Sequence, residues 1–131
     1  MITHTSTVTV FVMDQDRALA FYIEKLGFEK RSDNPMGPGA PRWIEVAPPG
    51  AQTAILLYKP TESMPGASTY ERALSSIGTF TTFIFNVDDR EATCRELESR
   101  GVEFVDKPRR QAYGWWASIK DADGNVIGLH Q

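Results

Sequence analysis

Two ionisable side chains in this sequence have the type and setting that acid–base chemistry needs. Glu45 stands between Ile44 and Val46 in an alternating segment, so it falls on a partly buried face, where a carboxylate is either paired or has a raised pKa. His130 lies in the last alternating segment. A carboxylate and an imidazole that converge on one substrate can abstract a proton beside a carbonyl group. The simpler alternatives are a Glu45 that is merely paired and a His130 that is a partly exposed strand end.

Four aromatic side chains favour a flat or aromatic ligand: Trp43, Tyr58, Tyr113 and Trp116. Ring faces stack, and indole N–H and phenol O–H groups can fix the orientation of a bound molecule. Core packing explains two tryptophans on a sheet equally well. The sequence leaves both interpretations open.

Two arginines and one cysteine are the remaining candidates. Arg109 and Arg110 follow Pro108 in an expected loop ahead of the second hairpin, where a guanidinium could clamp a carboxylate or a phosphate. A solvated charge pair is the favoured interpretation. Cys94 is interpreted as an apolar helix residue, because no histidine is placed near it. We expect no cofactor.

The composition excludes several classes of partner. Fourteen Lys and Arg against 17 Asp and Glu give a net charge of −3 without any basic stripe, so nucleic acid is not expected. No apolar run approaches the roughly 20 residues that cross a bilayer, so no membrane partner is expected. One cysteine and no leader-like N-terminus fit a reducing cytoplasm. The length predicts a single domain, 1–131.

The strands and helices that must position these residues occur in the same order in both halves of the chain. A strand from Thr7 to Val12 precedes a helix for which Asp14 and Asp16 offer N-cap oxygens and which Gly27 ends. A hairpin of Arg42 to Ala47 and Thr53 to Tyr58 completes the first half.

The second half restarts the pattern. A strand from Thr81 to Val87 precedes a helix with Asp88 and Glu91 at the spacing of a capping box, and then a hairpin of Trp115 to Lys120 and Val126 to His130. The halves lie about 74 residues apart, which indicates an internal duplication. Chance matching of two capped helices is the alternative.

Each strand has one strongly apolar face, which we assign to the helix side. The other face mixes aromatic, small, hydroxyl and ionisable groups, as the wall of a small-molecule cavity does. An exposed face or a face buried in a dimer is the alternative. The candidate ligand-binding residues are Thr7, Thr9, Trp43, Glu45, Leu56, Tyr58, Thr82, Ile84, Tyr113, Trp116, Gly128 and His130.

Three segments, Val10 to Tyr22, Lys25 to Phe28 and Asp121 to Leu129, resemble the vicinal oxygen chelate superfamily of glyoxalases, extradiol dioxygenases and bleomycin-resistance proteins. The resemblance spans nearly the whole chain. It implies an α+β fold of two tandem βαβββ modules whose curved mixed sheets enclose a cleft, commonly in a homodimer. The modules and the connecting loop are expected at about 1–60, 78–131 and 60–77.

Metal-dependent members of that superfamily carry His or Glu ligands on the first and last strand of each module. The resemblance places these positions at Thr7, Leu56, Thr82 and Gly128. A hydroxyl is a weak neutral donor, and leucine and glycine have no ligating side chain, whereas such sites use imidazole or carboxylate. We therefore expect no metal at these positions.

Three functions remain open. The leading hypothesis is a metal-free protein of the bleomycin-resistance type that binds a flat or aromatic organic molecule. The alternative is a glyoxalase- or dioxygenase-like lyase or isomerase that uses Glu45 and His130, or a metal at shifted positions. The third is a module whose mixed face binds another protein. A homodimer is expected, because two open sheets must bury their edges and outer surfaces.

Overall fold

Each half of the chain forms a four-stranded mixed sheet. The computed structural model describes residues 1–64 and 69–131. The chain divides into Met1–Ile77 and Gly78–Gln131, here called unit 1 and unit 2. In chain order the elements are β1 (Thr7–Phe11), α1 (Gln15–Ala20), η1 (Phe21–Lys25), β2 (Glu29–Asn34), β3 (Trp43–Ala47), β4 (Ala54–Tyr58), α2 (Thr69–Ser76), β5 (Phe80–Asn86), α3 (Arg90–Ser99), β6 (Phe104–Gln111), β7 (Gly114–Lys120) and β8 (Val126–His130).

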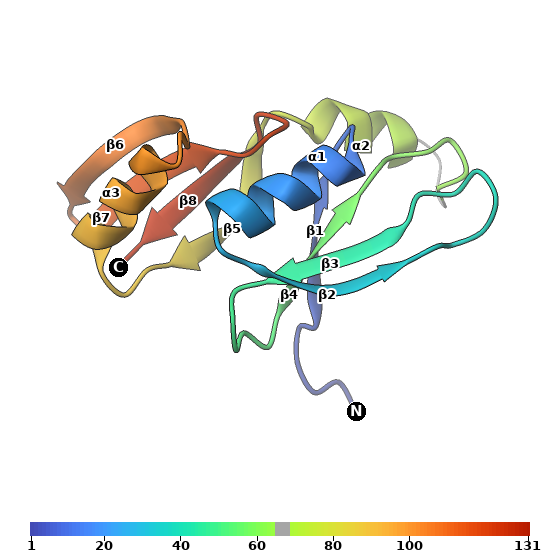
Figure 1. Cartoon of the computed structure of the whole chain (residues 1–131), viewed down its shortest axis with the longest axis horizontal. Coiled ribbons are helices and arrows are strands. Elements are labelled where there is room, and N and C mark those ends of the chain that lie inside the picture. The colour runs from blue at the N-terminus through green and yellow to red at the C-terminus, as the bar shows by residue number, and fades with distance from the viewer. Residues whose placement is uncertain (65–68) are drawn as a thin grey trace. The chain divides into compact units, whose positions relative to one another are not determined.

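Unit 1 contains sheet A, with the strand order β1-β4-β3-β2. β1 runs parallel to β4, and β3 and β4 form the predicted antiparallel hairpin. α1 lies along one face of this sheet (Figure 1). Val12, Tyr22, Ile44 and Leu57 are fully buried. Each such side chain contributes roughly 1.5–3 kcal/mol of hydrophobic stabilisation.

Polar side chains fix α1 to sheet A. Of the two N-cap candidates, Asp14 caps the helix, and its carboxylate accepts a hydrogen bond from the backbone N–H of Arg17 at 3.0 Å, whereas Asp16 lies in the first turn. The buried Gln15 amide donates to the backbone carbonyls of Arg42 and Leu57 at 2.7 and 2.9 Å. The helix continues into the π-helical turn η1 and stops before Gly27, whose φ of 74° suits only a residue without a Cβ.

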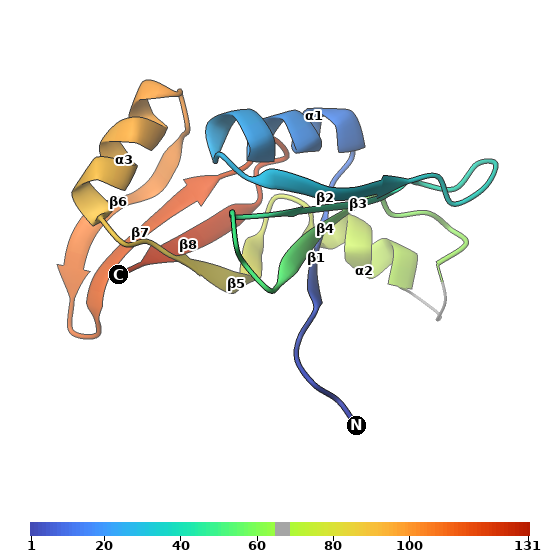
Figure 2. The same cartoon turned by 60° about the horizontal axis from the view of Figure 1, so that its bottom comes forward.

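Unit 2 repeats this topology in sheet B, with the strand order β5-β8-β7-β6. β5 runs parallel to β8, and β7 and β8 form the second predicted hairpin. α3 lies against one face of the sheet (Figures 1 and 2), and its Cys94 and Leu97 are buried as apolar helix residues. The shared order of elements confirms two tandem βαβββ modules.

The turn between β7 and β8 is fixed by its own side chains. Asp121 accepts hydrogen bonds from the backbone N–H groups of Asp123 and Asn125, both at 2.9 Å. The Asn125 amide donates to Asp121 and accepts from the backbone N–H of Gly78, which precedes β5. This closing motif therefore has a structural role, joining the last hairpin to the first strand of the unit.

β2 and β6 are edge strands that were not identified from the sequence pattern. Their sequences, EKRSDN and FVDKPRRQ, are strongly polar and lack the alternation of apolar and polar residues. Charged residues and proline are common on edge strands. Arg109 and Arg110 lie in β6, so the loop expected for them is wrong. The capping box is also wrong: Asp89 rather than Asp88 is the N-cap of α3, and it accepts from the Ala92 N–H.

A third helix, α2, forms inside the connecting segment that was expected as a loop at 60–77. It lies on the opposite side of sheet A from α1 (Figure 2), and its Ala73 is buried. The expected loop at 60–77 falls partly on residues 65–68, which are outside the described residues. In the described part of the chain, no helix has the length and apolar character to span a membrane.

Candidate functional site

The predicted ligand residues lie mainly on the sheet faces turned away from α1 and α3, which we call the open faces. Strand pairing fixes these faces, because paired residues point to the same side. Sheet A carries Thr7, Thr9, Trp43, Glu45, Leu56 and Tyr58 on its open face. The open face of sheet B carries Thr82, Ile84, Trp116, Gly128 and His130. Tyr113 lies in the turn between β6 and β7.

Glu45 is the centre of a hydrogen-bond cluster on the open face of sheet A. Its Oε2 accepts from the hydroxyl of Thr7 at 3.0 Å. Its Oε1 accepts from the hydroxyl of Ser32 at 3.0 Å and from the indole Nε1–H of Trp43 at 3.1 Å. The carboxylate is thus held by donors from β1, β2 and β3.

This environment keeps the Glu45 carboxylate charged. Burial alone raises the pKa of Glu45, but the hydrogen bonds from Ser32, Trp43 and Thr7 outweigh it and hold the pKa below its ordinary value. A carboxylate with a lowered pKa is a weak general base near neutral pH. The geometry therefore favours Glu45 as an acceptor that orders the sheet.

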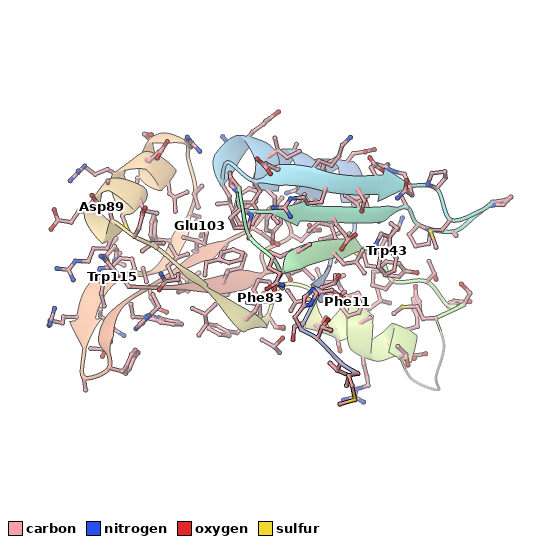
Figure 3. The ribbon with its side chains drawn as sticks, turned by 90° about the horizontal axis from the view of Figure 1, so that it is seen from below. Phe11, Trp43, Phe83, Asp89, Glu103 and Trp115 are labelled. Atoms are coloured by element: carbon pink, nitrogen blue, oxygen red, sulfur yellow. The ribbon has the colours of Figure 1, made fainter. Side chains whose placement is uncertain are left out.

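The part of the open face of sheet A that β4 contributes is largely closed. Leu56 and Ala54 are only 6% and 7% exposed. Trp43 and Tyr58 meet edge to face, with ring centroids 6.4 Å apart. Figure 3 shows Phe11 and Trp43 on the side of the sheet that α2 occupies. Leu56 and Ala54 are thus closed to a ligand, whereas Trp43 and Tyr58 are half-buried and engaged with each other.

The open face of sheet B is built around Trp116, whose indole ring lies over Gly128. A Cβ added to Gly128 would meet Cη2, Cζ2 and Cζ3 of this ring at 2.2, 2.8 and 2.9 Å. No side chain fits between the ring and the strand. Gly128 thus makes room for the six-membered ring of a tryptophan from the neighbouring strand.

Other apolar side chains surround this indole and remain exposed. The ring of Phe80 is nearly parallel to that of Trp116, at 6.2 Å between centroids and 18° between planes, and Tyr113 meets Trp116 edge to face at 6.4 Å. Phe80, Ile84 and Tyr113 are 52%, 53% and 64% exposed. We call Phe80, Ile84, Tyr113 and Trp116 the aromatic platform.

His130 borders the platform. It is paired with Trp116 across β7 and β8, and its Nε2 lies 3.4 Å from the carbonyl oxygen of Tyr113. A carbonyl only accepts, so this contact requires the hydrogen on Nε2. Glu45 and His130 belong to different units, and their pairing as acid and base stays a prediction.

The four positions at which the resemblance would place metal ligands do not fit a divalent ion. The Thr7 hydroxyl donates to Glu45, Leu56 is a buried aliphatic side chain, and the space beside Gly128 is filled by an indole. Thr82 offers one exposed hydroxyl. Across residues 1–64 and 69–131, no group of three or more His, Cys, Asp or Glu side chains is arranged to hold an ion.

The sequence interpretation missed two residues of these faces. Ser32 lies in β2, whose polar sequence gives no periodic signal. Phe80 precedes the strand start expected at Thr81, although its even number would have placed it with Ile84 on the open face. The alternation of β5 therefore carried the signal for Phe80.

Comparisons with known proteins agree with this architecture. The family model for the Glyoxalase/Bleomycin resistance protein/Dioxygenase superfamily matches residues 2–129. The uncharacterized protein YetH of Bacillus subtilis (strain 168) is 39% identical over 131 residues, covering 100% of both chains.

Two crystal structures are similar over nearly their whole length. TnmS3, an antibiotic binding protein from Streptomyces sp. CB03234, is 36% identical with a TM-score of 0.78, covering 99% of this chain and 96% of that one. A superfamily member from Sphaerobacter thermophilus DSM 20745 is 33% identical with a TM-score of 0.81, covering 98% and 97%. The family match and the repeated module together show that this chain belongs to the glyoxalase/bleomycin resistance protein/dioxygenase superfamily.

Proposed function

We propose that this protein binds a small, flat organic molecule against the aromatic platform and holds it without chemical turnover. The carrying observation is the indole of Trp116 lying on Gly128, with Phe80 and Tyr113 beside it. Large apolar side chains gathered and exposed on one face mark an interaction site. Rings held in fixed positions favour stacking with another flat ring system.

The similarity to TnmS3 supports this ligand class. TnmS3 is an antibiotic binding protein, and the two chains align over 99% and 96% of their lengths. An antibiotic-like organic molecule is therefore the natural kind of ligand to test. The aromatic platform consists of this chain's own residues, so the proposal extends to the class of ligand and not to the particular ligand of TnmS3.

Metal-free binding is the second part of the proposal. Its support is the chemistry of Thr7, Leu56, Thr82 and Gly128, which provide no carboxylate or imidazole. The lowered pKa of Glu45 also argues against this residue as a base for proton abstraction. Elemental analysis of protein purified without chelator tests this part, and a stoichiometric divalent ion would overturn it.

The binding proposal is tested by NMR titration of ¹⁵N-labelled protein with neutral two- and three-ring aromatic amides, of which 2-naphthamide is the smallest. We expect the indole N–H signal of Trp116 to shift and saturate. Trp115 is the internal control, since it is 6% exposed and lies on the opposite face of β7. In Trp116→Ala, affinity falls by about tenfold or more, because stacking and apolar contact are lost. No saturable shift at Trp116 with any probe contradicts the proposal.

The homodimer and the cytoplasmic location expected from the sequence stay predictions. Light scattering on the purified chain tests the first, and cell fractionation tests the second. The sheet A candidates, Thr9, Trp43 and Tyr58, stay predictions as ligand contacts, and the same NMR titration reports on them.

A further inference from the structure

Strand register places two basic side chains on either side of Trp116. Trp116 is paired with His130 of β8 and with Arg109 of β6. Paired residues of an antiparallel ladder point to the same face, with Cβ atoms about 5 Å apart. Arg109 and His130 therefore flank the indole on the open face of sheet B.

Among the described residues, Arg109 has no acidic partner that neutralises it. It is exposed, and within residues 1–64 and 69–131 its guanidinium makes no ion pair or hydrogen bond. Two other cations of unit 2, Arg95 and Lys120, by contrast form ion pairs with Glu91 and Glu103.

The nearest acid of β6 on the same face is engaged elsewhere. Asp106 is paired with Ser118, and its Oδ2 accepts from the Ser118 hydroxyl at 2.8 Å, while its own backbone N–H donates to that hydroxyl at 3.1 Å. The pairing of β6 with β7 is interrupted between Asp106 and Arg109, around Pro108. The Arg109 guanidinium is thus left available beside the platform.

We infer that the ligand is a flat aromatic acid, with its ring on the aromatic platform and its anionic group on Arg109. This inference rests on the proposed function and names the chemical class of ligand for the same site. A guanidinium presents a planar fork of donors that binds a carboxylate, sulfonate or phosphate through two parallel hydrogen bonds. The chain as a whole carries a net charge of −3, so an anion needs such a local cation to be held.

Arg110 provides a matched control. It is the next residue of the same edge strand, but it is paired with Trp115 and therefore belongs to the opposite face. Both arginines are exposed, so replacing either one removes one positive charge at a site that tolerates substitution. The two variants differ only in the face from which the charge is removed.

The test compares 2-naphthoate with its neutral isostere 2-naphthamide by calorimetry and by the Trp116 indole signal. We expect the wild-type protein to bind the carboxylate about tenfold more tightly than the amide, as one charge-assisted bidentate contact provides. Arg109→Gln should abolish this preference, so that carboxylate and amide bind equally, and Arg110→Gln should keep it. High salt should reduce the preference, because Arg109 is exposed.

The outcomes separate the two proposals. Equal affinity for carboxylate and amide in the wild type, or a preference that survives in Arg109→Gln, overturns the inference and leaves the binding function standing. Loss of the preference in Arg110→Gln also overturns it, since a general charge effect would then explain the data. If neither compound shifts Trp116, the proposed function fails, and the inference fails with it.

Discussion

The open face of sheet A and that of sheet B belong to modules with the same strand order, but their surfaces differ. Sheet A carries a hydrogen-bonded carboxylate, and α2 lies on this side of the sheet. Sheet B carries a glycine under an indole, with aromatic and apolar side chains half exposed around it. A duplicated scaffold can thus use one copy for stability and keep the other available for a ligand.

Equivalent strand positions show how this difference arises. The last strand of unit 1 reads Ala-Ile-Leu-Leu-Tyr, and both of its faces are buried. The last strand of unit 2 reads Val-Ile-Gly-Leu-His, and its central residue has no side chain. The Leu56 side chain fills the space on the open face of sheet A. At the equivalent position of sheet B, Gly128 has no side chain, and the Trp116 ring fills that space. The change from leucine to glycine at this equivalent position thus accompanies the change from a packed strand centre in sheet A to the aromatic platform in sheet B.

The largest effect is expected from Glu45→Ala on sheet A. Removing the acceptor leaves the donors of Thr7, Ser32 and Trp43 without their partner, at a cost of about 2–3 kcal/mol in the free energy of unfolding. Urea denaturation measures this change. The control is Ser32→Ala, which removes one donor and should cost about 1 kcal/mol. Equal stability of Glu45→Ala and the wild type would show that the cluster does not order sheet A.

The next effect is expected from Gly128→Ala on sheet B. The new Cβ would lie 2.2 Å from Cη2 of Trp116, so the ring must move, at a cost of about 1–3 kcal/mol. The indole signal of Trp116 should shift, and affinity for aromatic probes should fall. In a Trp116→Ala background the same substitution should cost little, because the clash is absent. An unchanged cost in that background contradicts the role given to Gly128.

The pH dependence of stability sharpens the comparison further. The folded pKa of Glu45 lies below its ordinary value of 4.5, so the charged form stabilises the native state above that pH. This contribution is lost as the pH falls from the ordinary value through the folded pKa. Asp33, whose pKa is lowered chiefly by its hydrogen bond from Arg42, acts in the same direction. The difference in Tm between wild type and Glu45→Gln, measured from pH 7 to pH 3, isolates Glu45 and should shrink on acidification.

Local sequence signals predicted much of this fold, and their limits are physical. Alternation in the buried strands identified the strand faces that pack against the helices, because burial on one side of a strand imposes a period of two. Asp14, as an N-cap candidate, indicated where the first helix begins. Edge strands β2 and β6 are solvated and need no such pattern, so they were predicted only through the resemblance. Their absence from the pattern also hid Ser32, which donates to Glu45, and the pairing of Arg109 with Trp116.

The smallest effect on stability, and the sharpest test of the difference between the faces, comes from Tyr113→Ser. Tyr113 is 64% exposed in a turn, so its replacement should change the free energy of unfolding by less than about 0.5 kcal/mol. The same change removes a ring that meets Trp116 edge to face, and affinity for 2-naphthamide should fall several-fold. The matched variant Tyr58→Ser on sheet A should show the opposite pattern, since Tyr58 packs against Trp43 on a face that α2 covers: a clear loss of stability with little change in binding. If the two variants behave alike in both measurements, the open faces do not divide stability and binding between them.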